Sequence, residues 1–231
     1  MEETCIIRQP AGLGDIFYTQ KIAKKILSEN KANIVIWPVI DNFIYLKDYL
    51  IDKNIKYVKL SEFVKPKNSF EVQLDGIHHK YLDTTTIMLA KYESVGLDPS
   101  DWVNYFKFKR NIKREDRLYN KLITPEIEKE GYILRSEYYG SPPKPLHHNL
   151  LYEGKFNIID IKFYENVNIF DWCKIIENAR EIYMVDTCFI YIFEKLNLNS
   201  KNNFLYSRFK PANFSHIKHI PQNVHWKYKQ W

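Results

Sequence analysis

The first 27 residues hold a short apolar run, a glycine turn and a helical repeat in immediate succession. Residues 5–7 are apolar and predict a buried strand, and Gly12 and Gly14 mark the turn that follows. Apolar residues then recur at helical spacing over residues 16–27. A strand that enters a helix through a tight glycine turn opens an open α/β sheet, in which ligands bind at the carboxyl ends of the strands. The stretch therefore directs attention to Asp15, which stands where the turn becomes the helix.

The glycine turn does not match a dinucleotide-binding fingerprint. Gly12 and Gly14 supply its first two glycines, but Phe17 stands at the third position, where glycine lets helix and strand pack closely. The next apolar run, residues 33–37, ends in Trp-Pro and not in an acidic residue that could bind a ribose hydroxyl. We therefore do not expect NAD or FAD. Asp15 is then either the cap of the first helix or a functional carboxylate.

The alternation of strands and helices continues along the whole chain. Apolar runs predict further strands at residues 56–60, 70–74, 131–136, 156–161, 181–186 and 203–206. Helical patterns cover residues 84–95, 112–123, 169–179 and 188–196. The pattern is interrupted at residues 125–130 and then begins again. The sequence thus predicts an α/β protein with two small domains, residues 1–124 and 125–231.

The composition supports a folded chain without a dedicated nucleic-acid function. Of 231 residues, 45% are hydrophobic, and the net charge of +6 comes from 34 basic residues mixed with 28 acidic ones. Residues 107–117 are basic and contain two phenylalanines, which would suit a nucleic-acid patch. Because Glu115 and Asp116 interrupt them, a solvated helix face explains them equally well. We expect no nucleic-acid partner.

The three cysteines indicate neither a disulfide framework nor a zinc site. Cys5, Cys173 and Cys188 form no closely spaced pair, and the histidine pairs at 78–79 and 147–148 stand far from them. Reduced thiols are the simplest interpretation, and we expect no metal.

Targeting signals are not recognised either. The acidic start of the chain lacks a hydrophobic signal region, and no apolar run reaches the roughly 20 residues of a membrane span. We expect a cytoplasmic protein without a transmembrane segment.

The second half contains a counterpart of the opening unit. A predicted strand, residues 181–186, ends in Asp186 and Thr187, and a helix begins at once. These side chains would lie at the carboxyl end of the sheet, where a helix start can face a diphosphate. Their alternative role is to cap that helix.

Together these elements resemble the glycosyltransferases of GT-B architecture, in particular the heptosyltransferase-like group. Members of that group open with a strand and a Gly-Asp turn, as at Gly14 and Asp15, and carry a helix–strand–Asp-Thr–helix element, as in residues 175–196. The resemblance implies two Rossmann-like domains with a cleft between them, an acceptor-side domain followed by a donor domain. This chain differs where the group continues Asp-Thr-Gly and then histidine, because it has Cys188 and Tyr191 there. Its short length suggests a compact member of viral or phage type.

The resemblance also implies a reaction and a set of residues. A sugar would pass from a nucleotide-sugar donor to a hydroxyl of a glycan or other acceptor, without metal or cofactor and with inversion. Asp15 would be the general base. The residues expected at the donor or its phosphates are Gly12, Gly14, Arg135, Ser136, Tyr138, Asp186, Thr187 and Cys188. Arg135 suits phosphate oxygens, although an exposed or salt-bridged arginine would look the same in sequence. The alternatives are a non-catalytic nucleotide or glycan binder, and a nucleic-acid-associated protein that uses residues 107–117. The oligomeric state stays open.

Overall fold

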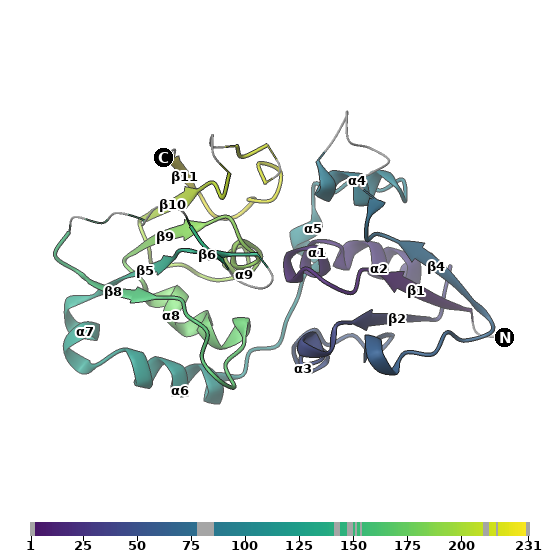
Figure 1. The fold of residues 1–231 in the computed structure, drawn as a ribbon, viewed down its shortest axis with the longest axis horizontal. Helices are drawn as coiled ribbons and strands as arrows, with labels where there is room; N and C mark the ends of the chain where they lie inside the picture. Colours follow the sequence, from purple (N-terminus) through teal and green to yellow (C-terminus); the bar gives the residue numbers. More distant parts are fainter. Residues whose placement is uncertain are drawn as a thin grey trace. The chain divides into compact units, whose positions relative to one another are not determined.

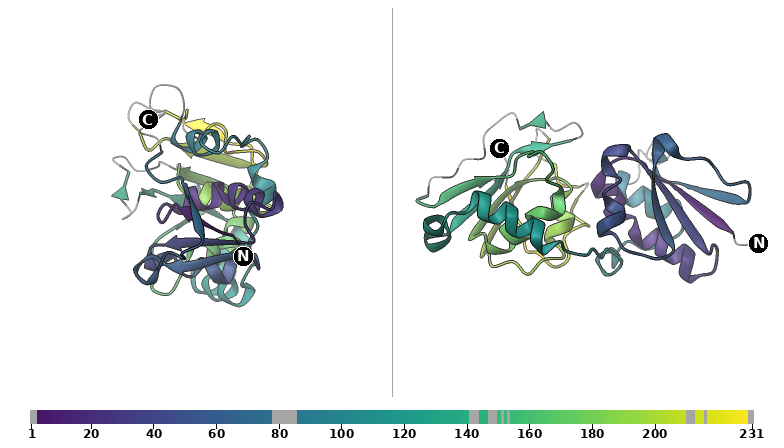
Figure 2. Two further views of the ribbon diagram at one scale, coloured as in Figure 1. Left: turned by 90° about the vertical axis from the view of Figure 1, so that its right-hand side faces the viewer. Right: turned by 90° about the horizontal axis from the view of Figure 1, so that it is seen from below.

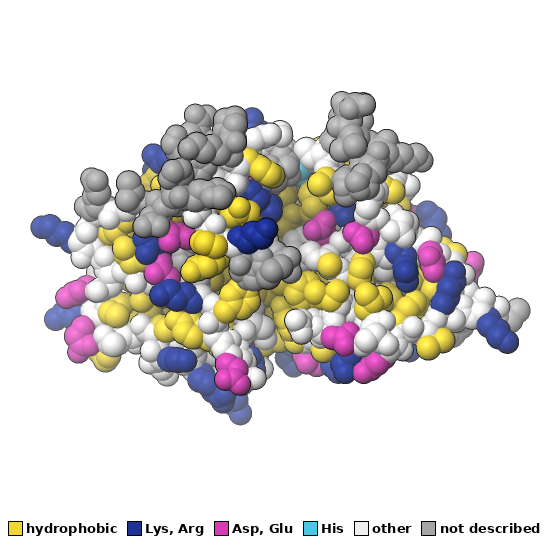
Figure 3. All heavy atoms as spheres, viewed as in Figure 1, with side chains coloured by type: hydrophobic (Ala, Val, Ile, Leu, Met, Phe, Trp, Pro, Cys, Tyr) yellow, Lys and Arg dark blue, Asp and Glu magenta, His cyan; other side chains and the backbone are white. Residues whose placement is uncertain are grey.

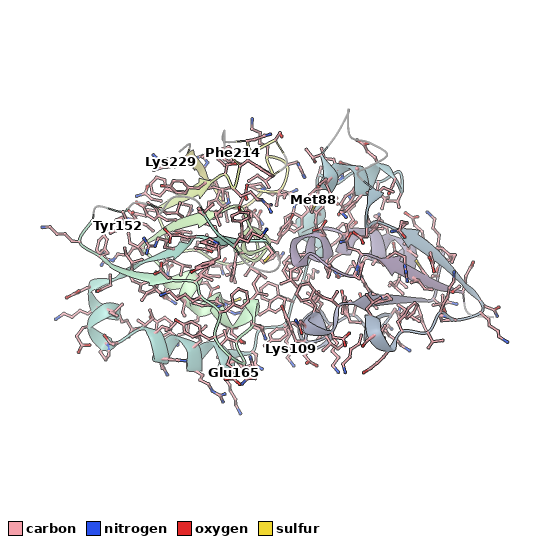
Figure 4. The ribbon with its side chains drawn as sticks, viewed as in Figure 1. Met88, Lys109, Tyr152, Glu165, Phe214 and Lys229 are labelled. Carbon is pink, nitrogen blue, oxygen red and sulfur yellow. The ribbon has the colours of Figure 1, made fainter. Side chains whose placement is uncertain are left out.

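The computed structural model describes residues 3–77, 86–140, 144–146, 150, 152, 154–209, 213–215 and 217–229. The chain divides into two compact units, Met1–Lys109 and Arg110–Trp231, and each is an α/β layer structure built on its own parallel sheet (Figure 1). Lys109, labelled in Figure 4, is the last residue of the first unit. The α/β class predicted from sequence is confirmed.

The first unit contains a four-stranded parallel sheet in the order β3-β2-β1-β4. Its strands are β1 (Thr4–Arg8), β2 (Ile34–Val39), β3 (Ile55–Lys59) and β4 (Ser69–Gln73). The four strands predicted for this half are therefore confirmed. The chain order reverses beside β1, because β2 lies on one side of it and β4 on the other. Such a reversal is where open α/β sheets bind ligands, at the carboxyl ends of the strands.

The helices of the first unit are short. They are α1 (Leu13–Tyr18), α2 (Gln20–Ser28), α3 (Leu46–Tyr49), α4 (Ile87–Glu93) and α5 (Trp102–Tyr105), with 3-10 turns η1 (Asp41–Phe43) and η2 (Leu60–Glu62). One predicted helix, residues 16–27, is instead two, because Thr19 interrupts it and donates its hydroxyl to the Asp15 carbonyl at 2.7 Å.

An aromatic cluster fixes α1, α4 and α5 to one another. The Tyr18 ring lies 4.9 Å from that of Tyr92 and 5.6 Å from that of Trp102, and all three residues are fully buried. The Tyr92 hydroxyl also donates to the Tyr18 carbonyl at 2.6 Å. Aromatic pairs of this kind contribute packing and orientation beyond area burial. The cluster thus sets the position of α4 against α1.

The second unit contains a five-stranded parallel sheet in the order β11-β10-β9-β5-β8. Figure 2 shows the strands and helices of each unit from two further sides. The strands of the second sheet are β5 (Tyr132–Ser136), β8 (Asn157–Asp160), β9 (Glu181–Val185), β10 (Asn202–Tyr206) and β11 (Lys227–Lys229). Read from β8, the strands follow the order 2-1-3-4-5, which reverses between β5 and β9. The four strands predicted for this half are confirmed, and β11 is an addition that the apolar runs did not predict. Phe214, labelled in Figure 4, packs edge-on against Tyr228 of β11 at 4.8 Å.

The second unit begins earlier than the predicted boundary at 124/125. Its helices are α6 (Ile112–Leu122), α7 (Pro125–Glu130), η4 (Ile169–Trp172), α8 (Cys173–Asn178) and α9 (Phe189–Phe193). Arg110 forms ion pairs with Glu115 on α6 and, at 2.7 Å, with Glu177 on α8. Helix α6 packs on η4 and α8. The predicted boundary segment is itself helix α7, capped by the Thr124 hydroxyl.

After β5 the chain forms the small antiparallel pair β6 (Tyr138–Tyr139) and β7 (Lys144–Pro145). The histidine pairs at 78–79 and 147–148 lie outside the described residues. In the part of the chain that the structure describes, no helix is both long and apolar enough to cross a membrane.

Candidate functional site

Asp15 lies at the reversal point of the first sheet, in contact with a buried lysine. It belongs to the first turn of α1, immediately after the turn that follows β1. Its carboxylate Oδ1 is 3.1 Å from Nζ of Lys91 on α4. The Lys91 side chain is only 3% exposed, whereas that of Asp15 is 28% exposed. The pair therefore has its positive partner inside the protein and its negative partner at the surface.

Lys91 is held by two further acceptors. Its ammonium donates to Oε1 of Gln9 and, at 2.7 Å, to the carbonyl of Leu74. Gln9 and Leu74 follow β1 and β4, the two neighbouring strands at the reversal, so the lysine joins their carboxyl ends. Gln9 is anchored as well, because its carbonyl accepts from Nε1 of Trp37 at 2.9 Å. A buried ammonium with three oxygen partners is the arrangement that offsets its desolvation.

The backbone at Gly12 permits this geometry. Gly12 has φ = +77°, a left-handed conformation that favours glycine, and a Cβ built there would overlap the Asp15 carboxylate. Gly12 is also the N-cap position of α1, and no side chain caps that helix. The capping role that was the alternative for Asp15 is therefore not what the structure shows. Gly14 lies within the first turn of α1.

Arg135, predicted as a phosphate ligand, is engaged in ion pairs at the end of β5. Its Nε donates to Oδ1 of Asp160 at 2.7 Å, and Nη1 lies 3.7 Å from Glu137 and donates to the carbonyl of Leu150 at 3.2 Å. The hydrogen bond to Asp160 raises the pKa of Arg135. This is the salt-bridged arginine of the alternative interpretation. The neighbouring Ser136 is buried, and Tyr138 is exposed on β6.

Asp186 lies at the reversal edge of the second sheet and is fully buried. Its Oδ1 is 2.7 Å from Nε of Arg208, and its Oδ2 accepts from the Arg208 backbone N–H at 3.4 Å. The Thr187 hydroxyl accepts from the Phe189 N–H at 3.4 Å, and Cys188 is the partly exposed residue before α9. Sequence reasoning missed Arg208, whose signal is a basic side chain two residues beyond a predicted strand.

Two of the basic residues in the segment 107–117, Arg110 and Arg114, are held in ion pairs inside the second unit. Besides Arg110, Arg114 is paired, with Nη2 at 2.7 Å from Oδ2 of the buried Asp171. Glu115 is buried in the Arg110 pair and raises the pKa of that arginine. On the face shown in Figure 3, basic and acidic side chains are interspersed. Arg110 and Arg114 therefore have a structural role in the second unit, because each compensates a buried carboxylate.

A groove of about 640 Å³ lies at the opposite edge of the second sheet. It is lined by residues 194–201, which precede β10, and by residues 223–225, which precede β11. Because both segments precede their strands, the groove lies at the amino-terminal edge. It contains none of the predicted donor residues, and we do not assign the reaction to it.

The thiols and the metal-ligand side chains offer no metal centre within the described residues. No group of three or more His, Cys, Asp or Glu side chains there could hold a metal ion. Burial raises the pKa of Cys5 to about 12 and that of Cys173 well above its ordinary value. Both thiols are therefore poor ligands and poor nucleophiles in the folded protein.

Comparisons of the fold lead to glycosyltransferases. No protein-family model and no curated protein match the chain. Among solved structures, the glycosyl transferase family 9 protein of Veillonella parvula DSM 2008 matches with a TM-score of 0.55 at 7% identity, over 99% of this chain and 85% of its own. The iron-containing dodecameric glycosyltransferase TibC from enterotoxigenic E. coli H10407 matches with a TM-score of 0.51 at 12% identity.

A second structure of TibC, a heptosyltransferase in complex with ADP-D-beta-D-heptose, gives a TM-score of 0.52 at 12% identity. Each TibC match covers 89% of this chain, which spans 58% of the length of TibC. At these identities the comparisons show a shared fold. The fold is that of family 9-like glycosyltransferases.

Proposed function

We propose that this protein is a glycosyltransferase that moves a sugar from a nucleotide-sugar donor to an acceptor hydroxyl. One observation carries the proposal: a partly exposed carboxylate, Asp15, is fixed by the buried Lys91 at the reversal point of a sheet whose fold is shared with glycosyltransferases. This is the edge where open α/β sheets bind ligands. A carboxylate held there by a buried cation is suited to positioned general-base chemistry.

In the proposed step Asp15 accepts the proton of the acceptor hydroxyl. The acceptor oxygen forms a bond to the anomeric carbon, and the bond from that carbon to the diphosphate oxygen breaks. The leaving nucleoside diphosphate takes the electron pair, and attack from the opposite face inverts the anomeric centre. Lys91 keeps the carboxylate oriented and supplies the compensating charge, while Gly12 leaves space beside it.

We assign the acceptor to the first unit and the donor to the second. TibC has been seen with ADP-D-beta-D-heptose, and a nucleotide sugar is the donor class that we propose here. The proposed donor-side residues of the second unit belong to or directly follow β5, β6 and β9, and they are Ser136, Tyr138, Asp186, Thr187 and Cys188. No cofactor enters the step. TibC is described as iron-containing, but the described residues of this chain offer no such site, and we derive no step through a metal. The cytoplasm is the proposed location.

The test begins with donor binding and continues to transfer. Sugar nucleotides of uridine, guanosine, adenosine and cytidine are screened by thermal shift, beside NAD and a short oligonucleotide. A ligand at about 100 times its Kd stabilises the native state by about 2.7 kcal/mol, which raises the melting temperature measurably. Nucleoside diphosphate release in the presence of mixed glycan acceptors is then measured. Stabilisation by the oligonucleotide alone would contradict the proposal, and donor binding without turnover would leave a non-catalytic binder.

A further inference from the structure

Arg208 was not among the donor-side residues predicted from the sequence. It forms an ion pair with Asp186, a fully buried carboxylate at the carboxyl edge of the second sheet. It follows β10, the neighbour of β9, and Asp186 follows β9. Asp186 holds the arginine twice, through Nε at 2.7 Å and through the backbone N–H at 3.4 Å. The guanidinium also lies 5.8 Å from the Phe209 ring centroid. Its orientation is therefore set by the protein.

The loop that carries Arg208 is fixed as well. The buried Ser207 donates its hydroxyl to the Asn213 carbonyl at 3.0 Å and accepts from the backbone N–H groups of Phe209 and Asn213, both at 3.1 Å. Asp186 in turn donates its backbone N–H to the Tyr206 carbonyl at 3.0 Å. Both sequence neighbours of Arg208, Ser207 and Phe209, are thus held by hydrogen bonds.

The outer part of the guanidinium is available to a ligand. The Arg208 side chain is 31% exposed, and within the described part of the chain Nη1 and Nη2 have no hydrogen-bond partner. Nε lies 2.7 Å from Asp186 in an ion pair, so the two terminal nitrogens keep the planar pair of donors that matches phosphate oxygens. Arg135 differs, since Asp160, Glu137 and the Leu150 carbonyl surround its guanidinium.

We propose that Arg208 binds the diphosphate of a nucleoside diphosphate and that Asp186 positions it. This inference rests on the proposed function, because it names the group that neutralises the donor's leaving group. Asp186 fixes the guanidinium through Nε, and the terminal nitrogens donate to phosphate oxygens of the bound donor and of the departing diphosphate. A cation fixed before the ligand arrives contributes more to binding than a mobile one.

The experiment measures binding to the full chain by isothermal titration calorimetry. The probes are ADP, UDP, GDP, CDP, their parent nucleosides and inorganic pyrophosphate. The variants are Arg208→Met and the double variant Asp186→Asn/Arg208→Met, since the single change leaves a buried carboxylate unpaired and costs stability. Arg117→Met is the matched control, an exposed arginine of the same unit.

We expect both Arg208 variants to bind the preferred diphosphate about 10- to 100-fold more weakly, the effect of losing charge-assisted hydrogen bonds. Their affinity for the parent nucleoside should stay unchanged, which a general loss of structure would not allow, and Arg117→Met should match the wild type. Folded Arg208 variants that bind the diphosphate like the wild type would overturn the assignment, as would a wild-type protein that binds none of the probes. If the wild type transfers sugar but the Arg208 variants bind the diphosphate normally, the assignment of Arg208 is wrong and the proposed function stands. Diphosphate binding that depends on Arg208, without any transfer, would support Arg208 and refute the proposed function.

Discussion

Replacing Lys91 with methionine separates the buried ion pair at Asp15 from the packing around it. Methionine keeps an unbranched chain of similar length but has no ammonium. The change removes the donor to Gln9 Oε1 and to the Leu74 carbonyl, and it removes the partner 3.1 Å from Asp15. Gln9 and Leu74 are buried, so water does not replace the lost donor freely.

The magnitude follows from these contacts. Each buried acceptor that loses its donor costs about 1–3 kcal/mol. Relief from burying an ammonium offsets part of that cost, so we expect a net loss of about 2–3 kcal/mol. For a unit of this size, a loss of that magnitude lowers the melting temperature by roughly 10 °C. Turnover should fall as well, because the Asp15 carboxylate is no longer held in one orientation.

The assay compares thermal melts and donor turnover of Lys91→Met with those of Lys67→Met. Lys67 is an exposed lysine of the same unit and is expected to behave as the wild type. Turnover is read below the melting transition of the variant, so that unfolding does not mimic a catalytic loss. If Lys91→Met melts and turns over like Lys67→Met, the buried contacts inferred for Lys91 are wrong.

Three other predictions concern the glycine turn and the thiols. Gly12→Ala should lower both the melting temperature and turnover, since the left-handed conformation costs a non-glycine residue about 1–2 kcal/mol and the new Cβ would displace Asp15; an unaffected variant would show that the turn can relax. A disulfide reagent should modify Cys188 quickly and the buried Cys5 and Cys173 slowly, which Cys188→Ser tests by abolishing the fast phase. Because burial raises the pKa of Cys5 in the folded state, the unfolded thiol ionises first, and stability should fall as the pH rises above the ordinary thiol pKa of 9.0; Cys5→Ala should remove that part of the loss.

The strands of both sheets except β11 could be predicted from sequence, because each is a short apolar run with a clear turn after it. The β1 segment and its glycine turn are examples, since residues 5–7 and Gly12 lie where the apolar pattern places them. Helix ends were less predictable. The break at Thr19 depends on a side-chain hydrogen bond to the helix backbone, which leaves no trace in apolar periodicity.

Contacts between residues far apart in the sequence could not be predicted from the sequence patterns. Lys91 lies on α4, which falls inside the predicted helix 84–95. Its contact with Asp15, however, depends on the aromatic packing that positions α4. Arg135 and Asp160 both end predicted strands, and their cross-strand pairing follows only once β5 and β8 are known to be neighbours in that register. Arg208 similarly depends on β10 lying beside β9. Strand order, rather than strand position, is the information that was missing.

The central claim is tested most directly by the release of nucleoside diphosphate from the sugar nucleotide that stabilises the protein, measured for the wild type, Asp15→Asn and Asp48→Asn. Asp48 is an exposed carboxylate of the same unit and serves as the control. We expect Asp15→Asn to lose about 10²- to 10⁴-fold in turnover, the usual contribution of a general base, while its donor affinity and the activity of Asp48→Asn stay near those of the wild type. Equal turnover by Asp15→Asn and the wild type would contradict the account.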